Sequence, residues 1–223
     1  KWDMNRIFSD YYSQYLPPER QQEVGHRYMM GLYKMLESLN KSFPHILFEG
    51  CASGGNRFDL GMLCYFPQIW ASDDTDAIYR VSGQTGYSYG YPMSTVSAHV
   101  SDCPNHTVGR VTPFKTRGIV AMSGTFGYEL DVTKIPEEDK NMIASQVETY
   151  KKYCPLIQKG DYYRIASYQS NHYFDCYEIV SKDKKEAVLV FVQVIAQPNM
   201  HSRKVKLKAL KQGAKYKIEG KIY

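Results

Sequence analysis

Two groups of acidic residues in this 223-residue sequence could act together as a catalytic pair. Asp3 lies near the start of the chain, and an acidic cluster beginning at Asp73 follows the apolar run at 68–72. Cleavage of a glycosidic bond requires two carboxyl groups in opposite protonation states, so carboxylates from two strand ends suit that reaction. By residue type and spacing alone, the same acids could equally cap helices or be solvated, and both interpretations stay open.

The elements that would position these acids alternate between short apolar runs and helical patterns. Apolar runs that end in glycine or polar residues predict four buried strands, at 45–49, 68–72, 95–100 and 119–122. Helical patterns between them predict helices from Pro17 to Pro44, over 59–65, from Ala77 onward and over 135–153. This alternation is typical of a β/α barrel, in which the chemistry lies at the carboxyl ends of the strands.

The hydrophobic period changes after about Cys154. Two-residue alternation and turn signals predict strands at 162–166, 174–181, 186–196, 204–210 and 216–222, with a hairpin connection at 181–185. We therefore expect α/β barrel structure over residues 1–153 and an antiparallel β-sandwich domain over residues 154–223.

Composition narrows the possible classes of protein. Hydrophobic residues make up 43% of the chain, but no apolar run is long enough to cross a bilayer, so no membrane partner is expected. The charge of +5 comes partly from the strand-like run at 204–208, in which lysines alternate with apolar residues, so no nucleic-acid partner is expected. Five cysteines without paired spacing argue against a disulfide scaffold or a zinc site and favour a cytoplasmic protein. The start at Lys1 has no signal peptide and suggests that the natural N-terminus is absent.

Several motifs in order resemble the family 36 glycoside hydrolases, the bacterial-type α-galactosidases of a clan that includes the melibiases. The matching stretches over the first 135 residues are Lys1-Trp2-Asp3-Met4-Asn5-Arg6, Cys51 through Asp59, Trp70 through Ala77, Ala98-His99-Val100-Ser101, Pro104-Asn105-His106 and Met122 through Leu130. The resemblance implies the second half of a (β/α)8 barrel, because family members carry an N-terminal β domain and the first barrel strands before the first motif. It also implies a retaining mechanism without a metal or other cofactor.

The resemblance assigns roles to individual residues. Asp3 would be the nucleophile and Asp73 the general acid/base, while Lys1, Cys51, Ser53 and Trp70 would bind the galactose ring. Asn5 would either contact the substrate or support the residues that do, and Cys51 could instead be a packed thiol. Four further residues could reach the site or merely anchor loops: Arg57, Asp59, His99 and Arg117.

These expectations predict a retaining α-galactosidase that acts on melibiose- or raffinose-type oligosaccharides through a galactosyl-enzyme intermediate. A galactosyl-transferring relative and a noncatalytic carbohydrate-binding module remain as alternatives. Half a barrel would leave two open sheet edges, so we expect self-association into a homo-oligomer. For the same reason, we expect this chain to be inactive or very weakly active by itself.

Overall fold

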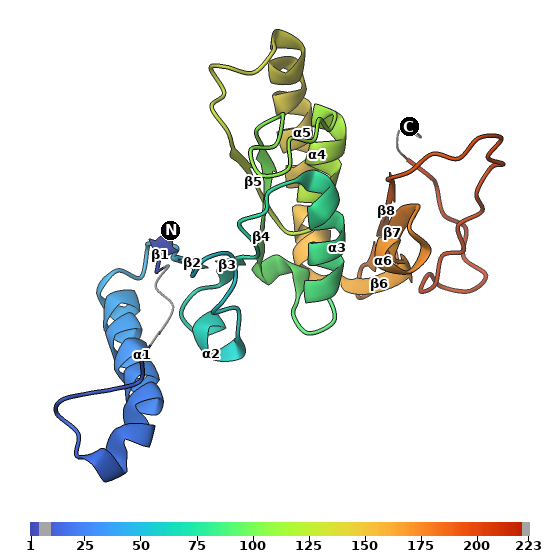
Figure 1. The fold of residues 1–223 in the computed structure, drawn as a ribbon. Helices are drawn as coiled ribbons and strands as arrows, with labels where there is room; N and C mark the ends of the chain where they lie inside the picture. Colours follow the sequence, from blue (N-terminus) through green and yellow to red (C-terminus); the bar gives the residue numbers. More distant parts are fainter. Residues whose placement is uncertain (5–9, 220–223) are drawn as a thin grey trace.

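A five-stranded parallel sheet forms the first part of the fold in this computed structural model, which describes residues 1–4 and 10–219 (Figure 1). Its strands are β1 (Trp2–Asp3), β2 (Glu49–Cys51), β3 (Gln68–Trp70), β4 (Val96–Ser101) and β5 (Thr125–Glu129), in that spatial order. Each strand pairs in parallel with the next strand along the chain. All the carboxyl ends therefore lie along one edge of the sheet, as in the barrel layout that the sequence predicts.

Each of these strands is followed by one or two helices along the chain. They are η1 (Pro18–Glu23), α1 (Val24–Ser42), α2 (Leu60–Leu63), α3 (Ala77–Tyr87), η2 (Met93–Thr95), α4 (Phe114–Ala121) and α5 (Glu137–Lys159). The apolar stripe of α1 buries Leu32 and Leu36 in one cluster with Ile69 of β3 and Val96 of β4. This cluster is the core on one face of the sheet. Among the described helices, none combines the length and apolar character needed to span a bilayer.

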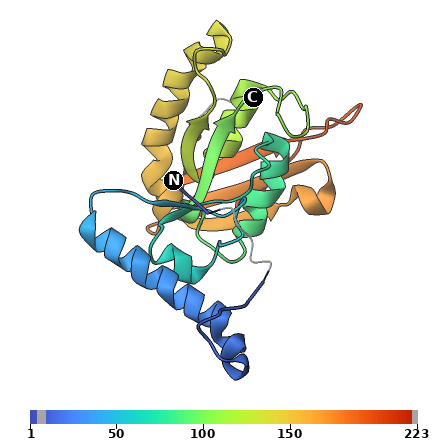
Figure 2. The same ribbon diagram turned by 60° about the vertical axis from the view of Figure 1, so that its left-hand side comes forward.

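A second, antiparallel sheet follows, with the order β6 (Asp161–Ala166), β7 (Phe174–Val180) and β8 (Ala187–Gln193). The short helix α6 (Tyr168–Asn171) lies between β6 and β7. The predicted hairpin joins β7 to β8, and Ser181 N donates to Glu186 O at 2.9 Å across it. The helices α3, α4 and α5 lie between the two sheets (Figures 1 and 2). The predicted α/β class followed by an antiparallel β region is confirmed.

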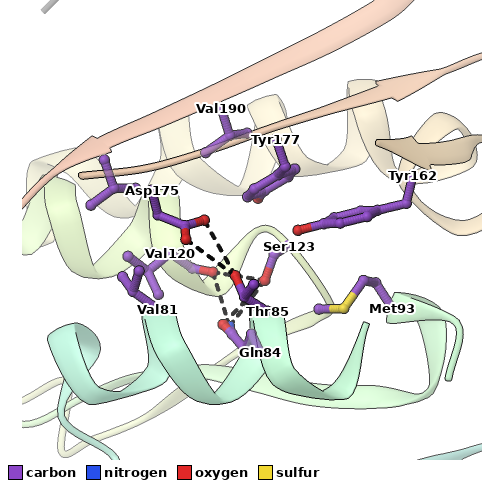
Figure 3. Close-up of a pocket in the computed structure, with 11 residues that line it drawn as sticks. Val81, Gln84, Thr85, Met93, Val120, Ser123, Tyr162, Asp175, Tyr177 and Val190 are labelled. Atoms are coloured by element: carbon purple, nitrogen blue, oxygen red, sulfur yellow. Dashed lines mark hydrogen bonds between the residues drawn. The ribbon is translucent and has the colours of Figure 1, made fainter. Parts of the chain in front are cut away.

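The contact between α3 and the antiparallel sheet encloses a cavity of about 20 Å³, enough for about one water molecule (Figure 3). Thr85 of α3 points across it to Asp175 of β7, and its hydroxyl donates to that carboxylate at 3.3 Å. Tyr162 and Tyr177 close the cavity from the side of the sheet. Helix α3 and the antiparallel sheet are thus joined through a buried polar contact as well as through apolar packing.

The predicted strand at 119–122 is wrong. These residues end helix α4 and its cap, and the strand lies at Thr125–Glu129, in the stretch expected to be a loop. The error has a physical cause: α4 contacts both sheets, and its residues Phe114, Val120 and Ala121 are buried. A short helix that is apolar on several sides has the same continuous apolar run as a buried strand.

Two expectations about the last third of the chain are also wrong. The helix expected to end at Tyr153 continues through Pro155 to Lys159, because Leu156 and Ile157 pack into a cluster with Tyr177. That packing outweighs the one helical hydrogen bond that proline removes. The described residues at 204–210 and 216–219 form no strand. The alternating lysines there do not pair with a neighbouring strand, although Lys208 N donates to Glu178 of β7 at 2.8 Å.

Candidate active site

The parallel sheet has two chemically different faces because neighbouring side chains along a strand point to opposite sides. Trp2 packs near Phe66, and a Cβ added to Gly50 would lie 2.9 Å from the same ring, so these residues belong to the apolar face. The residues beside them in sequence, Asp3 and Cys51, point the other way and are paired in the strand register. We call this opposite face, which carries Lys1, Asp3, Cys51, Trp70 and His99, the inner face.

Three inner-face side chains from different strands stack on one another. The Lys1 ammonium lies 4.0 Å from the centre of the Trp70 ring, and that ring lies 4.5 Å from the His99 imidazole. Trp70 is 4% exposed and Lys1 is exposed, so the stack runs from the sheet to solvent. A rigid aromatic surface beside an ammonium donor can bind a sugar ring and its hydroxyl groups.

His99 sits at the base of this stack as a neutral imidazole. Burial lowers its pKa to about 4, Arg80 and Lys1 act in the same direction, and Glu49 opposes them. Its buried Nδ1 has no hydrogen-bond partner within the described part of the chain. The ring also requires Gly127 on the neighbouring strand, since a Cβ there would lie 2.9 Å from His99 Cδ2.

Asp3 and Cys51 lie side by side at the carboxyl ends of β1 and β2. Asp3 is exposed and Cys51 is buried. Burial raises the pKa of the Cys51 thiol, and the Asp3 carboxylate beside it raises that pKa further. Cys51 is therefore a neutral thiol next to a carboxylate, which is an arrangement suited to contacting a bound ligand rather than attacking it.

The loop after β2 packs directly against the segment that carries Asp73. Ser53, Gly54 and Gly55 all have positive φ, from 50° to 93°. A Cβ on Gly54 would lie 2.4 Å from Asp73 N, and one on Gly55 would lie 2.7 Å from Ala71 O. The close approach of these two backbones therefore requires the glycines, and it places the loop that follows Cys51 next to Asp73.

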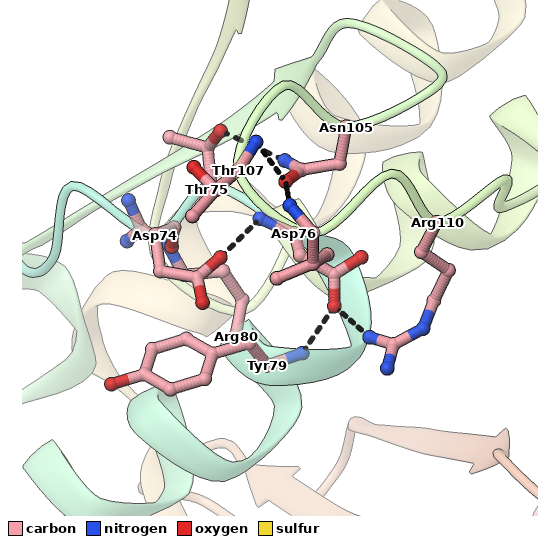
Figure 4. A network of polar contacts seen from close by, with 9 residues as sticks. Asp74, Thr75, Asp76, Tyr79, Arg80, Asn105, Thr107 and Arg110 are labelled. Atoms are coloured by element: carbon pink, nitrogen blue, oxygen red, sulfur yellow. Dashed lines mark hydrogen bonds and ion pairs between the residues drawn. The ribbon is translucent and has the colours of Figure 1, made fainter.

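Asp73 itself is exposed, whereas the residues after it are held by neighbouring groups (Figure 4). Asp76 caps helix α3 by accepting from Tyr79 N at 2.9 Å, and it also pairs with Arg110. Asn105 donates to the buried Thr75 hydroxyl at 3.2 Å. The acidic cluster thus divides into one exposed carboxylate, Asp73, and two, Asp74 and Asp76, that accept hydrogen bonds from the local backbone.

The structure gives mixed results for the residues predicted to bind substrate. Lys1 and Trp70 meet, Cys51 lies beside Asp3, and the loop of Ser53 lies against the Asp73 segment. Asn5 falls outside the described residues.

Three further candidates make hydrogen bonds that hold the fold. Arg57 donates to Met4 O at 2.9 Å, and Asp59 caps α2 by accepting from Met62 N at 2.9 Å. Arg117 donates to the backbone carbonyl of Thr112 at 3.0 Å. His99 is the fourth candidate, and it lies on the inner face.

Two inner-face contributors were not predicted from the sequence. Glu49 accepts from Gln68 at 3.0 Å and from the Ser97 hydroxyl, forming a polar layer beneath Trp70 and His99. Arg80 is 5% exposed and lies with its guanidinium carbon 5.4 Å from the Trp70 ring centre. Glu49 could have been recognised from the sequence because it is a charged residue in an otherwise apolar run. Arg80 could not, because one arginine among the polar and apolar residues of a helix does not indicate a functional residue.

Comparison with known proteins identifies the family. The Melibiase family model matches residues 1–160, and the model of the glycosyl hydrolase family 36 C-terminal domain matches residues 174–223. The chain belongs to glycoside hydrolase family 36. Within this family it is 50% identical over 221 residues to α-galactosidase AgaA of Geobacillus stearothermophilus, covering 99% of this chain and 30% of that protein. Its identity to α-galactosidase 1 of Pediococcus pentosaceus is 50% over 207 residues, covering 92% of this chain and 28% of that protein.

The structural comparison agrees with this assignment. A crystal structure of an AgaA variant in complex with raffinose superposes with a TM-score of 0.91 at 49% identity, covering 94% of this chain and 29% of that one. This family 36 chain therefore spans about 30% of the length of the curated relatives that it matches. The likeness also confirms the predicted fold, the second half of a (β/α)8 barrel followed by an antiparallel β region.

Within residues 1–4 and 10–219, no three His, Cys, Asp or Glu side chains are grouped so that they could hold an ion. The inner face instead offers carboxylates, a neutral thiol and a neutral imidazole.

Proposed function

We propose that the polypeptide containing this chain is a retaining α-galactosidase that removes terminal galactose from α-galactoside oligosaccharides. One observation supports this most directly: the exposed carboxylate Asp3 ends one strand of the parallel sheet, the exposed carboxylate Asp73 follows another, and the strand and loop of Cys51 lie between them. The relative bound to raffinose, a galactoside of this class, adds the substrate type. We place the enzyme in the cytoplasm, as the cysteine pattern of the sequence predicts.

In the proposed mechanism, Asp3 attacks the anomeric carbon while protonated Asp73 donates its proton to the departing oxygen. The product of this step is a galactosyl ester of Asp3. Asp73, now ionised, then removes a proton from water, and the water attacks the ester and releases galactose with retained configuration. Trp70 would provide an apolar surface for the sugar ring, and Lys1 would donate to its hydroxyl groups.

A trapping experiment tests the assignment of both acids. We expect a fluorinated α-galactoside to leave a covalent label on Asp3 of the complete polypeptide, located by mass spectrometry of its peptides. Asp3→Ala should abolish turnover. Asp73→Ala should lower the rate by about 10²- to 10⁴-fold for substrates with poor leaving groups and much less for activated ones.

Other results would redirect the proposal. A label on another residue, or equal loss on all substrates in the Asp73 variant, would reject these roles. Transfer of galactose to an added sugar acceptor in preference to water would indicate the transferring relative. Galactose binding that survives removal of both acids, without turnover, would indicate a noncatalytic module.

We also propose that residues 1–223 turn over little substrate by themselves and associate with further polypeptide through the parallel sheet. Within the described residues, this sheet ends at β1 and β5 without further strands. Lys1 and Asp3 of its inner face and Asp73 of the loop after β3 are all exposed. Comparing residues 1–223 with the complete polypeptide on a chromogenic α-galactoside tests this, and equal turnover would contradict it.

A further inference from the structure

Arg80 is a buried arginine directly behind the segment that carries Asp73. It lies one turn into helix α3 and is 5% exposed. Its Nη2 donates to Ser72 O at 2.6 Å and its Nε donates to Asp74 O at 2.9 Å. One guanidinium group thus binds the backbone on both sides of Asp73.

A third hydrogen bond connects this segment to the sheet. Arg80 Nη1 donates to Ser97 O of β4 at 3.4 Å. The planar guanidinium holds its donors in a fixed fork, so the three carbonyl groups are fixed relative to one another. The residues at 71–76 have no regular helix or strand to define their course. Arg80 therefore supplies the orientation that regular secondary structure supplies elsewhere.

The charge of Arg80 is retained despite burial. Burial lowers its pKa, while the acidic groups of Glu129, Asp74 and Asp73 raise it. An arginine stays protonated in proteins, so a positive charge lies close to the loop in both protonation states of Asp73.

We infer that Arg80 is a positioning residue for Asp73: it fixes the carbonyl groups of the flanking residues Ser72 and Asp74 so that the carboxyl group of Asp73 points toward the leaving oxygen of the substrate. This inference rests on the proposed function, in which Asp73 is the general acid/base. The exposed side chain of Asp73 has no regular element to hold it, so its direction is set by the backbone that Arg80 binds. Displacing a catalytic group by about 1 Å can lower a rate by about 10²-fold.

Arg117 provides a control because it is also a buried arginine that donates to two backbone carbonyls in another place, although its Nη2 in addition pairs with Asp139 at 3.4 Å. It is 7% exposed and donates to the backbone carbonyls of Thr112 at 3.0 Å and Ser101 at 2.5 Å. Those carbonyls lie at the end of β4 and in the loop before α4, and they flank neither Asp3 nor Asp73. Loss of a buried arginine fork should therefore destabilise both variants, but only the Arg80 variant should misdirect the acid.

The experiment compares Arg80→Lys, Arg117→Lys and Asp73→Ala in the complete polypeptide. Each is assayed for kcat/KM on raffinose, whose leaving group needs protonation, and on para-nitrophenyl α-galactoside, whose leaving group needs little. We expect Arg80→Lys to lose about 10- to 100-fold on raffinose and at most about 3-fold on the activated substrate, a weaker form of the Asp73→Ala pattern. Arg117→Lys should change both substrates by the same factor. Thermal unfolding gives the folded fraction of each variant.

The outcomes separate the inference from the proposed function. If Asp73→Ala itself fails to discriminate between the substrates, the proposed function is wrong. If Asp73→Ala discriminates but Arg80→Lys lowers both substrates equally, Arg80 is only structural and the inference is overturned. Should Arg80→Lys not fold at the assay temperature, Arg80→Gln is judged by the same criterion, because its amide is uncharged and fits the same buried space.

Discussion

The inner face of the parallel sheet and the contact between α3 and the antiparallel sheet each hold one titratable group, His99 and Asp175, whose pKa burial shifts toward the neutral form. On the inner face of the parallel sheet, burial lowers the pKa of His99 to about 4, and its Nδ1 has no partner within the described residues. At the contact between α3 and the antiparallel sheet, burial raises the pKa of Asp175. This carboxylate accepts from the Thr85 hydroxyl and from Tyr168 N.

The difference shows how a site can be told from a structural contact. Buried polar groups are normally satisfied by other protein groups, as Asp175 is. The inner face instead keeps hydrogen-bonding capacity that the protein does not fill, beside exposed Lys1 and Asp3. An incomplete partner set marks the site only together with the exposed groups beside it, because Glu178 Oε1 and Thr112 Oγ1 are also buried without a hydrogen-bond partner among the described residues.

The largest expected effect concerns the acid stability of the His99 region. The pKa of His99 is lower in the folded state than the usual value of about 6.5, so the unfolded chain takes up its proton first as the pH falls. Stability should therefore be unaffected above pH 6.5 and fall by about 2–3 kcal/mol between pH 6.5 and 4. Denaturant unfolding of wild type and His99→Gln across this range measures the difference. Parallel curves for the two proteins would show that His99 is not held neutral.

The second prediction concerns Lys1, whose replacement should weaken substrate binding at the inner face without lowering the free energy of unfolding. Lys1→Met keeps an unbranched side chain over Trp70 but removes the ammonium donor. We expect kcat/KM for an α-galactoside to fall by about 10- to 100-fold, because hydrogen bonds from charged groups contribute about 1.5–3 kcal/mol. The free energy of unfolding should change by less than about 0.5 kcal/mol, since Lys1 is exposed. A large loss of stability with unchanged kinetics would place Lys1 among the structural residues.

The smallest effect should come from removing the hydrogen bond between Thr85 and Asp175. Thr85→Val preserves side-chain shape and removes one donor to Asp175. Unfolding free energy should drop by about 1–2 kcal/mol at neutral pH, with kcat unchanged. Because the folded-state pKa of Asp175 is raised, the loss should shrink as the pH falls toward that pKa and the carboxyl group becomes neutral. A loss that is constant with pH would mean that Asp175 is not the group affected.

Helix α1 and the strands β3, β4, β6, β7 and β8 could be predicted because their apolar patterns are clear, whereas the strand expected at 45–49 lies at Glu49–Cys51 instead. The stripe through Leu32 and Leu36 predicts a helix that the structure places at Val24–Ser42. Residues 119–122 could not be assigned correctly, since an apolar run of that length does not distinguish a strand from a helix packed on several sides. Pro155 was misleading for a related reason, because the packing of Leu156 and Ile157 outweighs a local signal.

The sequence by itself determined the family, the α/β class and the candidate carboxylates, because these depend on residue identities along the chain. Only the tertiary structure brought Lys1, Trp70 and His99 into one stack and placed the Arg80 guanidinium across the backbone of Ser72 and Asp74. Such contacts join residues from different strands and helices, and no local pattern encodes them. Their geometry follows from strand register and close backbone packing, which exist only once the sheet has formed.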